Sequence, residues 1–164
     1  PETLCELGVQ IGADIPFCIQ GGTKLARGIG EILEPLPPLP DCCLVVCKPP
    51  VNVSTRAAYE RIDQGNLPVR PDTPAMLQAF QTADLPQIAH LVCNVFETAL
   101  EIPEVAAIRA KMLRHGALGA CMSGSGSAVF GVFDSNDQAL DALSALQSQY
   151  PMTFLCLPVQ QGVR

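Results

Sequence analysis

The segment from Pro35 to Pro40, PLPPLP, constrains the fold more than any other part of the sequence. Proline has a fixed φ and no backbone N–H, so such a run can form neither a helix interior nor a central strand. We predict an extended connection there, followed by a buried strand in the apolar segment CCLVVCKPP. The run therefore divides the chain into an opening part, residues 1–36, and a larger part, residues 41–164.

The opening part is expected to contain one helix and several short strands. The helix falls in PETLCELGVQIG, at the start of the chain. Three segments that follow, FCIQ, GTKLARG and GEILEPL, are short and bounded by glycine, a pattern typical of the strands of a meander.

The spacing of apolar residues becomes helical after the strand. A short helix is expected to start at Ser54 or Thr55, both of which can cap a helix, and the turn residues of GNLPVRPD close it. Between Pro74 and His115 the apolar positions recur at helical spacing, with breaks near Pro86 and Pro103, which predicts three helices.

The last third of the chain is expected to form a strand, a turn and a strand in HGALGACMSGSGSAVFGVF. A helix over residues 136–149 and a final strand in MTFLCLPV follow. Strands separated by helices or tight turns favour an α+β fold in which helices pack on an antiparallel sheet.

Composition excludes several classes of protein. The 164 residues are 48% hydrophobic and carry a net charge of −6 without a cluster of Lys or Arg, so a nucleic-acid partner is not expected. The sequence has no run of 18 apolar residues, so a membrane-spanning helix is not expected. It also lacks the basic-then-apolar start of a signal peptide, and we expect a cytoplasmic protein. The eight cysteines lie mostly in apolar runs without zinc-ligand spacing, so no metal site is predicted.

Asp14 is the first candidate for a catalytic role. It lies in GADIPF, where Pro16 favours an extended Ile15 and hence a chain reversal. A carboxylate at such a point can accept the proton of a substrate hydroxyl during phosphoryl transfer, or it can simply cap a turn or helix.

The second candidate is the segment Ser123-Gly124-Ser125-Gly126-Ser127. Its glycines permit positive φ angles, so that consecutive backbone N–H groups can converge on an anion such as phosphate. The segment matches neither a P-loop nor a dinucleotide fingerprint, and a plain glycine-rich hairpin is the alternative.

Thr55 and Tyr59 form the third candidate. They are four residues apart, so they share one face of the expected helix, and Tyr59 could stack on a nucleobase or be an ordinary half-buried tyrosine. His90 and His115 have no acidic or cysteine neighbours at ligand spacing and receive no role. Lys24, Arg27 and Lys48 are the only basic residues near the first two candidates, and a kinase needs positive charge near its phosphates, but ordinary surface positions are expected for all three.

Four segments together resemble one enzyme family. GADIPF, GGTKLARGIGE, CKPPVNVSTRAAY and MSGSGSAVFGVF occur in the order seen in the 4-diphosphocytidyl-2-C-methyl-D-erythritol kinases of the GHMP superfamily. The resemblance covers nearly the whole chain. It implies the ferredoxin-like C-terminal domain of that family, an antiparallel sheet with helices packed on one face, over residues 41–164, preceded by the end of the nucleotide-binding domain over residues 1–36.

The resemblance also implies the reaction and its residues. The γ-phosphoryl group of ATP, supplied with Mg²⁺, passes to the 2-hydroxyl of the cytidine diphosphate-linked methylerythritol in non-mevalonate isoprenoid synthesis. Asp14 matches the family's catalytic aspartate, Tyr59 the aromatic ring against the cytosine, and Thr55 a position beside the substrate. Gly124, Ser125, Gly126 and Ser127 match the third GHMP motif.

The family's N-terminal catalytic lysine and its PxxxGLGGGSS-type loop have no counterpart in these 164 residues. We therefore expect a fragment that by itself neither binds ATP nor turns over, and that self-associates through exposed apolar surface. Two alternatives stay open: a GHMP kinase acting on a different alcohol, and a catalytically silent ferredoxin-like module for ligand binding or oligomerisation.

Overall fold

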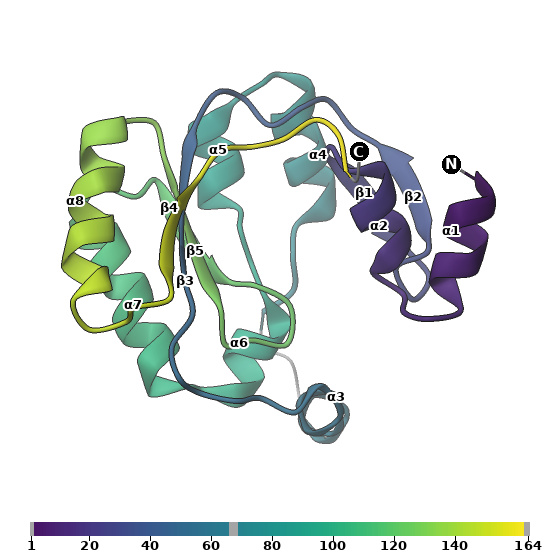
Figure 1. Cartoon of the computed structure of the whole chain (residues 1–164), viewed down its shortest axis with the longest axis horizontal. Coiled ribbons are helices and arrows are strands. Elements are labelled where there is room, and N and C mark those ends of the chain that lie inside the picture. Colours follow the sequence, from purple (N-terminus) through teal and green to yellow (C-terminus); the bar gives the residue numbers. More distant parts are fainter. Residues whose placement is uncertain (1, 66–68, 163–164) are drawn as a thin grey trace.

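The computed structural model describes residues 2–65 and 69–162, and Figure 1 shows their arrangement. The opening part contains helices α1 (Glu2–Val9) and α2 (Ile15–Gln20) and an antiparallel hairpin of β1 (Lys24–Arg27) and β2 (Ile32–Pro35). A four-residue turn, Gly28–Glu31, joins the two strands. The expected helix at the start and the strands in GTKLARG and GEILEPL are confirmed.

The expectation of a strand in FCIQ is wrong, because these residues belong to α2. Pro16 explains the difference. It lies in the first turn of α2, where a missing N–H costs no hydrogen bond and the fixed φ suits a helix. The expectation of an extended Ile15 is wrong for the same reason, because Ile15 is the first residue of this helix.

The proline-rich connection is confirmed: residues 36–40 form neither helix nor strand and lead to β3. The second sheet has four strands in the order β4-β5-β3-β6, and every neighbouring pair is antiparallel. In chain order this is strand 2-3-1-4, the ferredoxin-like arrangement. The larger part of the chain contains, in order, β3 (Cys43–Cys47), α3 (Thr55–Gln64), α4 (Thr73–Gln81), α5 (Leu85–His90), α6 (Val95–Leu100), α7 (Pro103–Arg114), β4 (Gly119–Met122), β5 (Val129–Phe133), α8 (Asn136–Gln147) and β6 (Thr153–Cys156).

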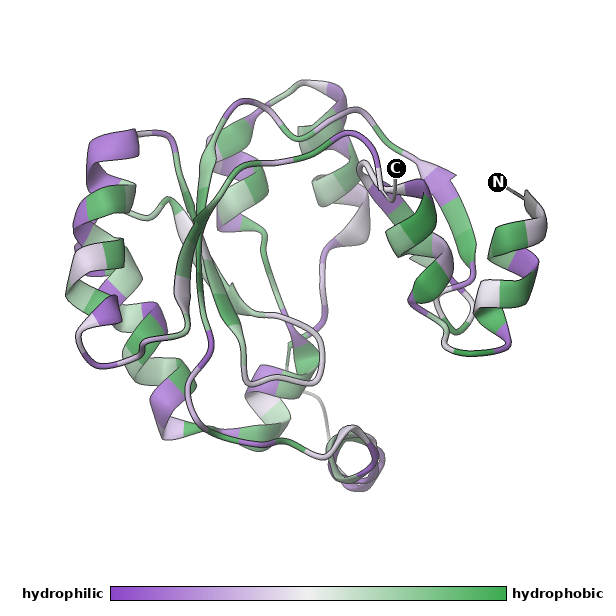
Figure 2. Cartoon of the chain, viewed as in Figure 1, coloured by the Kyte–Doolittle hydropathy of each residue, from purple (hydrophilic) through white to green (hydrophobic). Residues whose placement is uncertain are grey.

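Helices α7 and α8 cover one face of this sheet and form the main core there (Figure 1). Alternate residues of a strand point to opposite faces, so Val129 and Phe133 join this core while Val132 points away from it. On the opposite face Val132 packs with Leu85 and Ala89 of α5 in a smaller cluster. Figure 2 accordingly shows mostly apolar residues along the central strands.

Four helices, rather than the expected three, lie between residues 73 and 114. The missed break is at residues 91–94, where Asn94 caps α6 by accepting a hydrogen bond from Phe96 N. The expected breaks near Pro86 and Pro103 are confirmed, because residues 82–84 and 101–102 are not helical. Pro86 itself lies in the first turn of α5, which Asp84 caps. The break at residues 91–94 contains no proline, so the positions of the prolines did not predict it.

The remaining elements of the larger part are confirmed with small shifts of boundary. Ser54 caps α3 by accepting from Ala57 N, as its position suggested, and Ser135 caps α8 in the same way. Helix α8 ends at Gln147 instead of Gln149. Residues 66–68 of the turn segment GNLPVRPD lie outside the described residues. None of the helices described is both long and apolar enough to cross a bilayer.

Candidate functional site

The turn between β4 and β5 is the glycine loop, residues 123–127. Ser123 N donates to Ala128 O at 2.8 Å and Gly126 N donates to Ser123 O at 3.1 Å, so the turn is closed by its own backbone. Gly124 and Gly126 have φ angles of +56° and +94°, which favour glycine. A Cβ on Gly126 would lie 2.6 Å from Met122 Sδ, so this position also lacks space for a side chain.

Lys48, the residue after β3, contacts the glycine loop. Its Nζ donates to Ser127 Oγ at 2.8 Å, Val51 O at 2.8 Å and Pro49 O at 3.1 Å. Ser127 is fully buried, and its hydroxyl donates to Val51 O at 2.6 Å. The expectation that Lys48 is an ordinary surface lysine is therefore wrong, because all three of its N–H groups have acceptors within the protein.

No carboxylate pairs with Lys48 among the residues that the structure describes. Its charge therefore stays uncompensated beside the loop, and a fixed positive charge at this place favours an anion. Lys24 and Arg27 lie on the β1–β2 hairpin instead, where the exposed Arg27 pairs with Glu34.

Thr55 and the glycine loop are in direct contact. The hydroxyls of Thr55 and Ser125 are 3.0 Å apart, within hydrogen-bond distance, although the residues are 70 positions apart in the sequence. Thr55 is the first residue of α3, and Ser54, the cap of that helix, fixes its position. Two of the three sequence candidates therefore meet in one place.

Tyr59 follows one turn later on α3. Its ring lies edge-on to Phe96 of α6, with ring centroids 5.0 Å apart and an interplanar angle of 89°. The side chain remains 56% exposed, so the ring is positioned by a neighbour and still has a surface on which a planar group could stack. Phe96 had not been singled out from the sequence.

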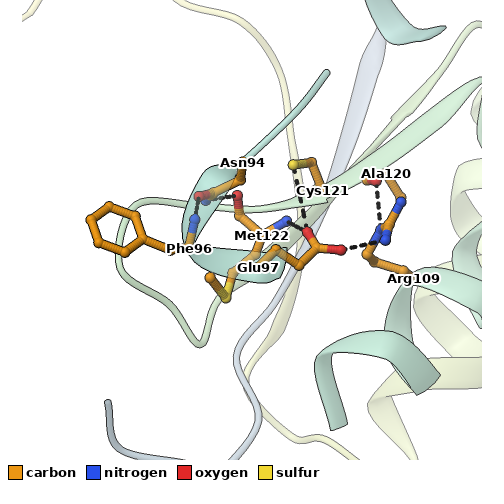
Figure 3. A network of polar contacts seen from close by, with 7 residues as sticks. All are labelled: Asn94, Phe96, Glu97, Arg109, Ala120, Cys121 and Met122. Carbon is orange, nitrogen blue, oxygen red and sulfur yellow. Dashed lines mark hydrogen bonds and ion pairs between the residues drawn. The ribbon is translucent and has the colours of Figure 1, made fainter. Parts of the chain in front are cut away.

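A group of three side chains, Asn94, Glu97 and Arg109, contacts the strand that leads into the loop (Figure 3). We call it the edge clamp. Arg109 and Glu97 form an ion pair, and Glu97 also accepts a hydrogen bond from Met122 N at 2.8 Å. Burial, aided by the nearby Glu97 carboxylate, raises the pKa of the adjacent Cys121 thiol to about 12, so this thiol is unreactive.

The sequence contains one local signal for part of the edge clamp. Asn94 followed by Glu97 resembles a capping box, in which the second side chain reaches back to the first residue's N–H. Here Asn94 does cap α6, but Glu97 bonds to Met122 N of β4 instead. The local pattern predicts the helix start, whereas only the tertiary structure reveals this use of the carboxylate.

Asp14 occupies the N-cap position of α2 but makes no capping hydrogen bond, and it is exposed. A Cβ on Gly30 would lie 3.8 Å from Asp14 Oδ1, so the two conspicuous segments GADIPF and GIGE are adjacent. No hydrogen bond links Asp14 to Thr55 or to the glycine loop in the described chain. Within the same residues, no group of three or more His, Cys, Asp or Glu side chains could bind a metal.

Comparison with known proteins identifies the family. Residues 76–151 match the profile described as "GHMP kinases C terminal". A 4-diphosphocytidyl-2-C-methyl-D-erythritol kinase of Lachnoclostridium phytofermentans is 46% identical over 140 residues, which cover 84% of this chain and 48% of the relative. The chain belongs to the GHMP kinase family. The enzyme of the same name from Alkaliphilus metalliredigens is 41% identical over 157 residues, 94% of the chain and 54% of the relative.

Solved structures of GHMP kinases agree with this assignment. A crystal structure of 4-(cytidine 5'-diphospho)-2C-methyl-D-erythritol kinase matches with a TM-score of 0.76 and 31% identity, covering 98% of this chain and 57% of that one. A homoserine kinase from Cytophaga hutchinsonii matches with a TM-score of 0.68 at 22% identity over 92% of this chain and 53% of that one, which shows the shared fold. The chain spans about half the length of the curated relatives that it matches.

Proposed function

We propose that this chain supplies the acceptor-substrate side of a kinase that phosphorylates the 2-hydroxyl of 4-diphosphocytidyl-2-C-methyl-D-erythritol. ATP with Mg²⁺ is the second substrate, and the nucleotide-binding half belongs to sequence outside these 164 residues. The observation that carries the proposal is the contact between Thr55 and Ser125, because it joins a substrate helix to a phosphate-proximal loop. The names of the relatives support the choice of acceptor.

Each candidate residue receives a role in this reaction. The acceptor hydroxyl oxygen attacks the γ-phosphorus of ATP, the bond to the β,γ-bridging oxygen breaks, and ADP leaves. Asp14 accepts the proton of the hydroxyl. Gly124, Ser125, Gly126 and Ser127 lie beside the phosphates, where Lys48 adds positive charge.

Tyr59 and Thr55 bind the acceptor rather than react with it. The exposed ring of Tyr59 stacks on the cytosine, a contact remote from the reacting hydroxyl. Thr55 lies four residues earlier on the same helix and contacts the loop, so it lies between the base and the phosphates. The acceptor thus extends from α3 toward Asp14.

A hybrid enzyme tests the proposal. Residues 1–164 replace the matched segment of the Alkaliphilus metalliredigens relative, and ADP release is measured with the cytidine substrate and, separately, with mevalonate, homoserine and galactose. We expect turnover with the cytidine substrate alone, and loss of that turnover in the same hybrid with Asp14→Asn.

Turnover with another of these alcohols instead would assign the chain to a different GHMP kinase. A hybrid that unfolds cooperatively on heating and yet turns over none of them would contradict the proposal and favour a catalytically silent module. In such an inactive hybrid, a melting temperature raised by the cytidine ligand would indicate a ligand-binding module, and an unchanged melting temperature would favour an oligomerisation module, since a ligand that binds the folded state raises the melting temperature.

A further inference from the structure

The outer edge of β4 is closed by side chains. This strand is at the end of the sheet order β4-β5-β3-β6, so half of its backbone groups point away from β5. Ala120 O accepts from Arg109 Nε at 2.9 Å, and Met122 N donates to Glu97 Oε2 at 2.8 Å. Met122 O accepts from Asn94 Nδ2 at 2.7 Å. The edge clamp thus makes the bonds that another strand would make.

Asn94 extends this arrangement to the glycine loop. Its Nδ2 also donates to Gly124 O at 2.8 Å, while its Oδ1 accepts from Phe96 N at 2.9 Å. One amide group therefore connects the strand, the loop and the first turn of α6. Figure 3 shows its bonds to Met122 of the strand and to Phe96 of the helix. Gly124 has a positive φ, and apart from its chain neighbours no atom of the described residues lies within 4 Å of the position that a Cβ would take there.

Helix α6 also contacts the proposed base-binding residue. Phe96 lies between the two clamp residues of α6 in sequence, and its ring packs against Tyr59. Asn94 and Glu97 reach the loop, whereas Phe96 reaches the ring on α3. A single short helix thus touches both ends of the proposed acceptor site.

We propose that Asn94 and Glu97 are positioning residues for phosphoryl transfer, and that α6 sets the distance between the base-stacking ring of Tyr59 and the glycine loop. The inference rests on the proposed function. It assigns the loop-facing bonds of Asn94 to the chemical step and the contact of Phe96 to acceptor binding, so the two roles affect different kinetic constants.

The ion pair within the clamp acts through geometry more than through charge. A cavity of about 730 Å³ is lined in part by Asn94, Glu97, Arg109 and Cys121. Arg109 is 39% exposed, so solvent screens its attraction to Glu97. The directional bonds to Ala120 O and Met122 N, rather than the charge pair itself, fix the strand.

Asn94→Asp separates loop positioning from helix capping. The aspartate keeps an oxygen that accepts from Phe96 N, but its carboxylate faces Met122 O and Gly124 O, which it cannot bond. In the hybrid enzyme we expect kcat to fall by about 10- to 100-fold, while KM for the cytidine substrate changes by less than about threefold. Phe96→Leu should show the reverse, a raised KM with a smaller change in kcat.

Ser135→Ala is the matched control. It removes the Ser135 hydroxyl, which caps α8 by accepting from Gln138 N. We expect it to lower the free energy of unfolding about as much as Asn94→Asp does, without changing kcat. Amide hydrogen exchange of the 164-residue chain gives a readout that does not need activity. Asn94→Asp should speed exchange of the Ser123 and Gly126 amides about tenfold relative to the Ser135→Ala chain.

The outcomes are distinct for the two proposals. Unchanged exchange at Ser123 and Gly126 in Asn94→Asp overturns the positioning role whether or not the hybrid is active. Faster exchange with unchanged kcat in an active hybrid overturns it as well. An inactive but folded parental hybrid contradicts the proposed function instead, and the exchange experiment still decides whether Asn94 restrains the loop.

Discussion

Replacing Lys48 with Met tests whether this lysine fastens the glycine loop to β3. Methionine keeps most of the apolar stem but removes the donors to Ser127 Oγ, Val51 O and Pro49 O. A hydrogen bond involving a charged group contributes about 1.5–3 kcal/mol, and the three bonds share one partly buried ammonium, so we expect a loss of about 3 kcal/mol. With a urea m-value of about 2 kcal/mol/M, the unfolding midpoint should fall by about 1.5 M.

Lys111→Met is the matched control for this change. Lys111 Nζ makes one bond, to Ala145 O at 2.7 Å, and none to the loop, so its loss should lower the midpoint by only about half as much. Ser127→Ala, introduced into the unchanged chain and into Lys48→Met, completes a double-mutant cycle for the Lys48–Ser127 bond. If Lys48→Met costs no more than Lys111→Met, or if the cycle is additive, the loop does not depend on Lys48 and our reasoning fails.

Three further predictions follow from the site. Asp14→Asn in the hybrid should lower kcat at least about 100-fold with little change in KM, and a near-parental kcat would return Asp14 to a structural role. Tyr59→Leu should raise KM for the cytidine substrate by the equivalent of about 1–3 kcal/mol, with Tyr59→Phe as control; a raised KM for ATP instead would mean that α3 is misassigned. Between its unfolded pKa of 9.0 and its folded pKa of about 12, Cys121 stays protonated only in the folded state, so stability should fall as pH rises through this range. Cys121→Ala should weaken that fall in urea unfolding measured at about pH 8 and about pH 10, and an unchanged dependence would argue against the raised pKa.

Local signals in the sequence predicted those parts of the fold that local physics determines. Ser54 and the helical spacing after it identify α3, and the glycines of residues 123–127 identify a hairpin turn. FCIQ was misassigned because a short, mostly apolar segment suits a strand and a helix equally, and only the helix-starting role of Pro16 decides between them. The division into residues 1–36 and 41–164 stays a prediction.

The candidate site was predictable in its centre but not in its surroundings. Glycine and serine in alternation indicate an anion-binding turn, and Thr55 indicates a helix start, but their 3.0 Å contact depends on the ferredoxin-like arrangement. Lys48 and Glu97 bond to the strand ends and the loop across 25 to 79 residues of sequence. Such long-range pairings are decided by which strand lies at the sheet edge, and periodicity carries no information on that point.

The side chains that close the edge of β4 also bear on misassembly. A strand edge with free backbone groups is a template for a strand from another molecule, and in this chain Asn94, Glu97 and Arg109 occupy that template. A mutation that removes one of these three side chains therefore loosens the glycine loop and also leaves backbone groups of β4 free to pair with a strand of another molecule. Substitutions of Asn94, Glu97 or Arg109 consequently carry two costs, misplacement of the loop and aggregation through the edge of β4.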